Sequence, residues 1–317
     1  MSKTQVKHNT QYTIHNTLSV VLATRNEEAN IGPCLDSVKR IADEIIIVDE
    51  TSTDRTREIA KNYGAKVFKV IHEPIFHKTK QKALNYATGN WILLLDADER
   101  VTQKLADEIK KIINSSNTDR LKRVLTLLHT DHNTLSSKKA KLFLRHQRLI
   151  EERDLPAGRQ VTQKSEEIVA FFVPRVNYFL GKPLIHAGVY PDGQIRLVKR
   201  GKARFPAKSV HEQMLVDGEV AWLFNDLEHH DSPTLRRYLE RMNRYTDLHA
   251  KELEQKNVPK DILHFLLFTI HYPLSTFMNL YLRHKGFLDG IRGFLWSIFS
   301  ALHFPLAYFK YLQQGEV

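Results

Sequence analysis

The chain has 317 residues, of which 42% are hydrophobic and 26% charged, and its formal net charge is +11. This length suits one large domain with an appendage, and the composition excludes a disordered chain. The single cysteine, Cys34, excludes an internal disulfide and a cysteine-rich zinc module. The positive charge indicates an anionic partner, such as a phosphorylated substrate, acidic lipid or nucleic acid.

Residues 1–17 are polar and lack the apolar core of a signal peptide. We therefore predict an N-terminal tail and a protein that stays in the cytoplasm.

The next hundred or so residues alternate between short apolar runs and helical periodicity. The predicted strands are residues 18–23, 44–49, 66–70 and 91–95, and the predicted helices are residues 31–41, 54–63, 78–88 and 102–113. This rhythm predicts a Rossmann-like, mostly parallel sheet with helices on both faces. Ligands bind such sheets beyond the carboxyl ends of the strands.

Two later regions break this pattern. Residues 115–167 carry no clear periodicity, and we predict an insertion there, within a domain that spans residues 18–231. Residues 232–317 are predicted to be helical. The segments 262–282 and 287–312 approach the length of a membrane span but contain polar interruptions. Their aromatic content favours a helical region that associates with a membrane surface, and the alternative is a subdomain packed on the main domain.

Acidic residues follow the predicted strands. Asp96 and Asp98 come directly after an apolar run, and their spacing of two directs both carboxylates to one side of an extended chain. Mg²⁺ and Mn²⁺ prefer such oxygen ligands. The alternative is a solvated acidic turn with a helix cap near Thr102. Asp49 and Glu27 have the same ambiguity between ligand contacts and loop structure.

The order of these motifs along the chain carries more information than any one of them. Residues 18–31, 47–56, 93–99, 188–196 and 210–212 together resemble the family 2 glycosyltransferases, which have the GT-A fold. Within that family, the stretch 285–293 is similar to the lipopolysaccharide core glucosyltransferases.

The resemblance implies inverting transfer of a hexose from a nucleotide diphosphate sugar, with a UDP-sugar favoured, to a saccharide or lipid-linked acceptor. It implies Mg²⁺ or Mn²⁺ as cofactor, a role in cell-envelope glycan synthesis at the inner face of the cell membrane, and no nucleic-acid partner. It also implies site roles: Thr24, Glu27, Asp49 and Asp96 for the nucleotide-sugar, Asp98 and His211 for the metal, Glu212 as general base, Arg196 and Lys199 for the acceptor or phosphates, and His229 as a further candidate.

These roles are chemically consistent. Inverting transfer needs one base for the acceptor hydroxyl and one cation for the departing diphosphate, and no carboxylate nucleophile. Without the resemblance, Glu212 would be interpreted as an exposed carboxylate paired with a basic residue, and His186, His229 and His230 as packing residues.

Some features depart from the family pattern or leave alternatives open. Glu50 stands where the family usually has a small residue, and we expect this extra carboxylate either to weaken nucleotide binding or to pair with Arg25 or Arg55. The arginines of the helix that begins near Leu235 are predicted to form a solvated face. Transfer to a polyprenyl phosphate is an alternative reaction. A non-catalytic membrane-surface protein with a degenerate site is an alternative of another class, and nucleic-acid binding is a weaker one.

Overall fold

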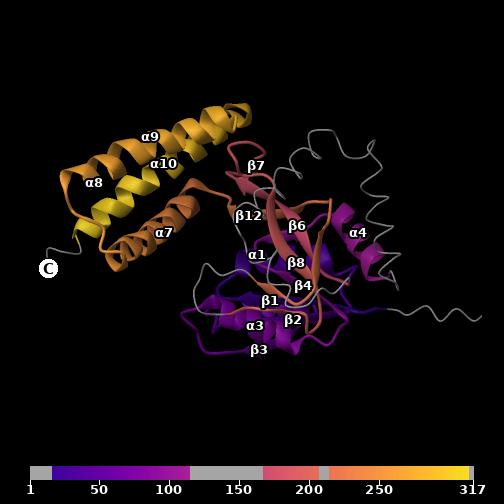
Figure 1. Ribbon diagram of the computed structural model, residues 1–317. Helices are drawn as coiled ribbons and strands as arrows, with labels where there is room; N and C mark the ends of the chain where they lie inside the picture. Colours follow the sequence, from indigo (N-terminus) through magenta and orange to yellow (C-terminus); the bar gives the residue numbers. More distant parts are fainter. Residues whose placement is uncertain (1–15, 115–166, 207–213, 314–317) are drawn as a thin grey trace, which may run out of the picture.

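The computed structural model describes residues 16–114, 167–206 and 214–313, which form an α/β domain and a tail of helices (Figure 1). The predicted insertion, apart from Glu167, lies outside the described residues. The strands and helices of the first part of the chain are β1 (Leu18–Thr24), α1 (Glu28–Val38), β2 (Glu44–Asp49), α2 (Thr56–Asn62), β3 (Lys66–Lys69), α3 (Phe76–Tyr86), β4 (Trp91–Leu95), β5 (Glu99–Val101) and α4 (Gln103–Ile113).

The prediction of alternating strands and helices is confirmed, with small shifts at the helix ends. Thr102 caps α4 through a hydrogen bond from the Leu105 amide, 3.2 Å long. By contrast, α2 begins only at Thr56, and its N-cap residue is Arg55, whose guanidinium has no acceptor to cap the helix. Ser52, a predicted cap, donates its hydroxyl to Asp49 instead.

The second part of the chain adds strands to the same sheet. They are β6 (Ile168–Phe179), β7 (Lys182–Pro183), β8 (Asp192–Lys199), β11 (Glu219–Trp222) and β12 (Leu227–Ser232), while β9 (Ala203–Arg204) and β10 (Leu215–Val216) form a separate pair. The order of the main sheet is β3-β2-β1-β4-β8-β6-β12-β5. Its first four strands are parallel, and β8 then pairs antiparallel with both β4 and β6.

Alternation along the strands divides the core into two layers. In β1, Leu18 and Leu22 belong to the cluster that includes Leu35 of α1 and Ile109 of α4. Val21, between them, belongs to the cluster that includes Ala83 of α3. Because successive side chains of a strand point to opposite faces, helices cover both faces of the sheet, as predicted.

The tail consists of α7 (Leu235–Gln255), α8 (Ile262–Leu266), α9 (Tyr272–Phe277) and α10 (Gly290–Gln313), with π-helical turns on either side of α9 and a short 3₁₀ helix before α10. In Figure 1 these helices lie beside one another and extend away from the sheet. Within the described ranges, no helix is both long enough and apolar enough to cross a membrane.

A tight clamp joins the tail to the loop before β8. Asp289 accepts hydrogen bonds from the amides of Ile185 and His186, at 3.1 and 2.8 Å. A Cβ atom on Gly293 would lie 1.8 Å from the carbonyl oxygen of Gly286, so only glycine permits this contact. The 285–293 stretch therefore fixes where the tail meets the sheet.

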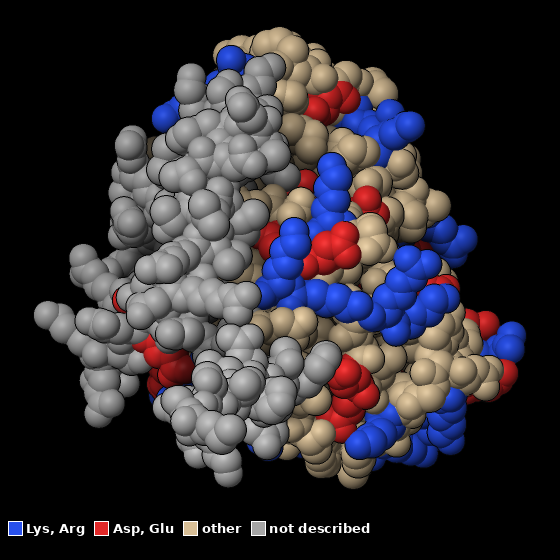
Figure 2. All heavy atoms as spheres, turned by 90° about the vertical axis from the view of Figure 1, so that its right-hand side faces the viewer, with Lys and Arg blue, Asp and Glu red and all other residues tan. Residues whose placement is uncertain are grey.

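Charged side chains of both signs are interspersed on the face seen in Figure 2, which lies on the far side of the sheet from the tail. Over the described part of this face, the positive net charge is not gathered into one patch.

Candidate functional site

Polar residues gather at the carboxyl ends of β1, β2 and β4. Thr24 pairs in register with Asp49, and its hydroxyl donates to the Asp49 carboxylate at 3.1 Å. Asp49 is fully buried and also accepts from the Ser52 amide at 2.9 Å, while the Arg57 Nε lies 3.4 Å away. Asp49 therefore organises the turn that leads into α2.

Glu50 does not pair with Arg25 or Arg55, so that expectation is wrong. It is buried on the opposite face of the sheet, where it contacts His72 at 2.6 Å and the hydroxyl of Thr79 in α3. Side-chain alternation explains the difference, because Asp49 faces α2 and the next residue faces α3. Glu50 therefore adds no charge to the side of the sheet on which Asp49 lies.

Asp96 lies between two cations. Lys80 of α3 and Arg196 of β8 each approach a different oxygen of its carboxylate, at 2.6 Å. Burial alone would disfavour the charged form, but Arg196 and Lys80 hold the pKa of Asp96 well below its usual range. Arg196 is itself buried and also contacts Glu99 at 2.5 Å. Its guanidinium therefore neutralises carboxylates within the protein.

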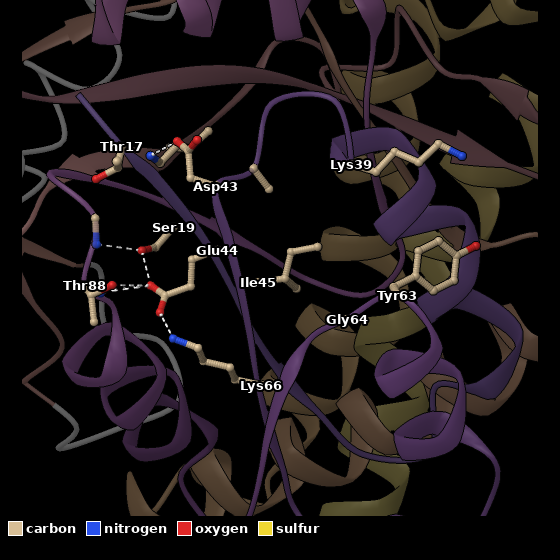
Figure 3. Close-up of a pocket in the computed structure, with 13 residues that line it drawn as sticks. Thr17, Ser19, Lys39, Asp43, Glu44, Ile45, Tyr63, Gly64, Lys66 and Thr88 are labelled. Carbon is tan, nitrogen blue, oxygen red and sulfur yellow. Dashed lines mark hydrogen bonds and ion pairs between the residues drawn. The ribbon is translucent and has the colours of Figure 1, made fainter. Parts of the chain in front are cut away.

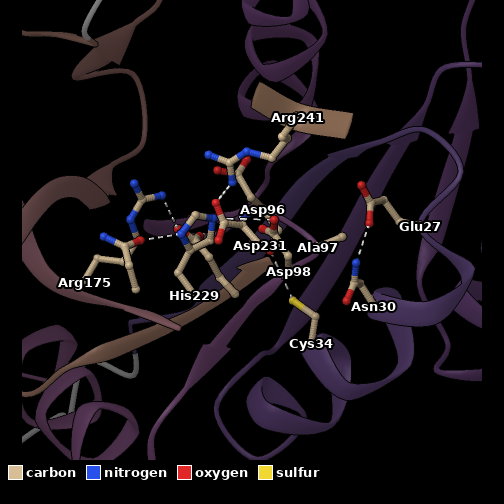
Figure 4. Close-up of polar contacts among 12 residues, drawn as sticks. Glu27, Asn30, Cys34, Asp96, Ala97, Asp98, Arg175, His229, Asp231 and Arg241 are labelled. Carbon is tan, nitrogen blue, oxygen red and sulfur yellow. Dashed lines mark hydrogen bonds and ion pairs between the residues drawn. The ribbon is translucent and has the colours of Figure 1, made fainter. Parts of the chain in front are cut away.

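Asp98 faces His229, whose Nε2 lies 3.5 Å from the carboxylate (Figure 4). Burial opposes ionisation of Asp98, but the hydrogen bond and charge of His229, with the charge of Arg175, lower its pKa. The other ring nitrogen of His229, Nδ1, lies 2.6 Å from the Asn177 amide oxygen. Asp98 and His229 come from distant parts of the chain, and the sheet brings them together.

The tautomer of His229 follows from its neighbours. The Asn177 amide nitrogen donates to Asp192 at 3.2 Å, which orients the amide oxygen toward the imidazole. Nδ1 of His229 must then carry the proton and donate. The other ring nitrogen, Nε2, faces the Asp98 carboxylate, and either a proton or a cation between these two groups makes the contact favourable.

Glu27 lies on the other side of this group, at the start of α1 (Figure 4). Burial raises its pKa, a hydrogen bond from Asn30 lowers it, and the charges of Asp98 and Asp96 raise it further. The net rise in the pKa of Glu27 therefore reflects burial first, and the charges of the two neighbouring carboxylates add to it.

The arginines of α7 do not all form a solvated face, which corrects that prediction. Arg236 pairs with Glu240 at the surface, as predicted. Arg241 is partly buried and forms an ion pair with Asp231 of β12, and the charge of Asp98 acts on its guanidinium. The charge of Arg237 acts on Glu27. The spacing of four between Arg237 and Arg241 is the signal in the sequence that indicates a shared face.

The structure does not place all of the predicted residues together. Lys199 pairs in register with Trp91 at the start of β4, whereas Asp96 follows its end, so Lys199 lies away from this group. It contacts Glu167 instead, at 2.5 Å. His230 stacks on Tyr178. The predicted base Glu212 and metal ligand His211 lie outside the described residues.

The described part of the chain contains no cluster of three or more His, Cys, Asp or Glu residues arranged to hold a metal ion. The pair formed by Asp98 and His229 nevertheless fits a divalent cation in donor type, because carboxylate oxygen and neutral imidazole are both metal ligands. The hydrogen bond from His229 to Asn177 is the outer support that ligating histidines commonly have.

A hollow of about 430 Å³ lies at the other end of the parallel strands, at the amino ends of β1, β2 and β3 (Figure 3). Its carboxylates bind to the protein itself. Asp43 accepts from the Leu18 amide at 2.7 Å, and Glu44 accepts from Ser19, Thr88 and Lys66. This hollow is a structural junction between strands.

Comparison with known proteins agrees with the motif order. The model of the family described as Glycosyl transferase family 2 matches residues 19–149. An uncharacterized glycosyltransferase of Rickettsia felis is 32% identical over 206 residues, which cover 58% of this chain and 71% of the relative. In three other rickettsial glycosyltransferases the identity is 43–45%, but the match covers only 35% of each relative's length.

A longer match extends into the tail. The lipopolysaccharide core biosynthesis glycosyltransferase LpsC of Rhizobium meliloti is 25% identical over 304 residues, or 94% of this chain and 92% of the relative. The solved glucosyl-3-phosphoglycerate synthase of Mycobacterium tuberculosis, in complex with Mn²⁺ and UDP-glucose, is 32% identical over 26% of this chain and 34% of that chain. The TM-score between the two structures is 0.25. The family match and the coverage of the Rickettsia felis relative show that the chain belongs to the family 2 glycosyltransferases, with an α/β domain of the GT-A type.

Proposed function

We propose that the protein transfers a hexose, with inversion, from a nucleoside diphosphate sugar to a saccharide or lipid-linked acceptor in the synthesis of a cell-envelope glycan. The observation that carries the proposal is the pair formed by His229 Nε2 and the Asp98 carboxylate, 3.5 Å apart. Imidazole nitrogen and carboxylate oxygen are both ligands for a divalent cation, and the pair lies beyond the carboxyl ends of the parallel strands, where such sheets bind ligands.

Thr24, Glu27, Asp49 and Asp96 form the donor pocket in this proposal. Asp49 orders the turn that would receive the base, and the pairing of Asp96 with Lys80 and Arg196 keeps its carboxylate fixed and charged. Such preorganised groups favour one donor pose and need no rearrangement at the moment of reaction.

Asp98 and His229 would hold Mg²⁺ or Mn²⁺, with His211 as a third ligand carried over from the family resemblance. The cation supplies neutralisation of the diphosphate as it leaves. Arg241 and Arg237 add positive charge on the α7 side of the same site, as judged from their electrostatic contact with Asp98 and Glu27.

In the transfer step, the acceptor hydroxyl attacks the anomeric carbon of the sugar while the bond from that carbon to the diphosphate oxygen breaks. The electron pair leaves with the nucleoside diphosphate, and the hydroxyl proton passes to Glu212, the proposed base. One displacement inverts the anomeric centre, so no residue forms a covalent bond to the sugar.

The relatives and the tail support the proposed acceptor and location. LpsC of Rhizobium meliloti is described as a lipopolysaccharide core enzyme, and we propose a related acceptor here. The tail exposes large apolar side chains, among them Ile262 at 72%, Ile291 at 64% and Leu274 at 60%. Large apolar side chains exposed to this degree favour contact with the cytoplasmic surface of a membrane, where lipid-linked acceptors are found.

Donor hydrolysis tests the proposal. Purified protein is incubated with UDP-, GDP- and dTDP-sugars and with Mn²⁺ or Mg²⁺, and released nucleotide is measured in wild type and Asp98→Asn. Asp36→Asn, on the exposed face of α1, is the matched control. We expect metal-dependent release from one donor, lost only in Asp98→Asn. Release that does not respond to chelation, or that survives in Asp98→Asn, would contradict the proposal.

A further inference from the structure

An apolar groove of about 440 Å³ runs between α7 and α10 in the tail. Tyr238, Met242 and Tyr245 line one wall at helical spacing, and Trp296 and Phe299 line the other. Tyr238 is buried, and its ring contacts those of Phe299 and Trp296 at 5.4 and 5.9 Å between centroids. The groove therefore has a closed aromatic floor and two helical walls.

The polar side chains that line the groove are largely engaged with the protein. His303 Nε2 lies 3.1 Å from His249 Nδ1, and Ser300 is hydrogen-bonded to Tyr238. A sugar ring needs several free hydrogen-bonding groups around it, whereas an alkyl chain needs none. The lining therefore favours an alkyl chain as the occupant.

Arg241 connects the groove to the candidate active site. It lines the groove, it pairs with Asp231 of β12, and its charge acts on Asp98. Arg241 and Arg244 also flank the ring of Tyr245, each with its guanidinium carbon 5.6 Å from the ring centroid. An occupant whose chain lies in the groove thus has Arg241 beside it, where α7 meets β12.

The two sides of the groove differ in charge, and this difference indicates which kind of molecule would bind in it. Arg241 lies on the side of the groove toward the site, and the same helices expose apolar side chains to solvent, including Leu239, Leu248 and Leu302. A chain drawn from a membrane along this apolar surface would bring an anionic head to the arginines. This arrangement of side chains fits an amphiphile whose anionic head is joined to a single alkyl chain.

We propose that this groove binds the alkyl chain of a lipid-linked acceptor whose anionic head lies beside Arg241 and whose reacting hydroxyl lies at the Asp98 site. The inference rests on the proposed function, and it narrows the acceptor to the lipid-linked class. It predicts that chain binding depends on the free volume of the groove and does not depend on the sugar donor.

The test uses dibromododecyl phosphate below its micelle concentration and the full-length protein. Bromine quenches tryptophan fluorescence on contact, and Trp296 lines the groove while Trp91 and Trp222 are buried in the sheet domain. We expect saturable quenching that is lost in Trp296→Phe. Thr276→Phe, which fills the groove from α9, is expected to weaken binding about tenfold or more. Leu274→Phe adds the same ring at an exposed position of α9 outside the groove and serves as the matched control.

Donor hydrolysis on the same samples separates the two proposals. We expect the same basal release of nucleotide in wild type, Thr276→Phe and Leu274→Phe. Quenching that persists in Trp296→Phe, or equal binding by Thr276→Phe and Leu274→Phe, would overturn the groove proposal and leave only surface adsorption. Saturable quenching with no turnover of any donor would refute the proposed transfer while the chain site stands.

Discussion

Carboxylate side chains lie at both ends of the parallel strands, but the groups that they contact differ between the two ends. At the amino ends, Asp43 and Glu44 are bonded to backbone amides, hydroxyls and one lysine, all of which belong to the protein. At the carboxyl ends, Asp98 has a histidine at 3.5 Å, and other carboxylates lie close to it. The difference is whether the carboxylates have bonding capacity left for a ligand.

The largest effect is expected when the charge of Asp98 is removed. Asp98→Asn should lower metal-dependent donor turnover about 100-fold or more, because the variant keeps the shape of the side chain and loses its charge toward the cation. Glu44→Gln, at the other end of the strands, should turn over donor at the wild-type rate. Steady-state kinetics on the two variants is the measurement. An equal loss of activity in both would contradict the difference between the two ends of the strands.

Arg196 should matter for stability as well as for turnover. Arg196→Met leaves Asp96 with Lys80 alone, and leaves the fully buried Glu99 with Arg175, 3.3 Å away. Loss of one partner of a buried pair costs about 3–5 kcal/mol. Urea unfolding should show this loss, and an unchanged midpoint would mean that Arg196 is a ligand contact and not a structural one.

Glu44 offers a pH-dependent measurement at the amino end. Burial opposes its ionisation, but hydrogen bonds from Lys66, Ser19 and Thr88 lower its pKa from 4.5 to about 2. Its contribution is therefore present above pH 4.5 and is lost as the pH falls toward 2. Glu44→Gln should lose about 2 kcal/mol at pH 7. The gap to wild type should narrow in urea titrations taken below pH 4.5, and a constant gap would contradict the assignment.

The smallest effect is expected in the tail. Burial lowers the pKa of both His249 and His303, and the charge of His249 acts on His303 as well. Below pH 6.5 the unfolded chain takes up protons before the folded one does, so stability should fall as the pH drops. Thermal melts of His303→Asn at pH 7.5 and 5.5 should show a smaller fall than wild type, and an equal fall would assign the pH dependence to other groups.

The sequence predicts the local elements well, because periodicity and turn residues are local signals. It predicts the parallel strands, their helices and the acidic residues at the strand ends. It does not reveal that β8 and β12 would bring Arg196 and His229 to Asp96 and Asp98, because those pairings join residues far apart in the chain. Alternation in β2 decides the partners of Glu50, and motif spacing alone suggested the wrong ones.

The contacts of the arginines of α7 likewise depend on tertiary packing. Charge on an amphipathic helix is usually solvated, and this default holds for Arg236. Arg241 differs because α7 follows directly after β12, whose Asp231 holds the guanidinium near the site. Which face of such a helix meets the sheet depends on tertiary packing, and the sequence pattern does not specify it.

The clamp formed by Asp289 also bears on how the molecule can move. It holds the backbone at Ile185 and His186, a few residues before Asp192, whose carboxylate binds Arg175 and Asn177. Asn177 in turn sets the tautomer of His229. A rocking motion of the tail would therefore pull on the loop that ends at Asp192. A force on the tail is therefore transmitted, through a continuous series of covalent and hydrogen bonds, to the His229 imidazole that faces Asp98.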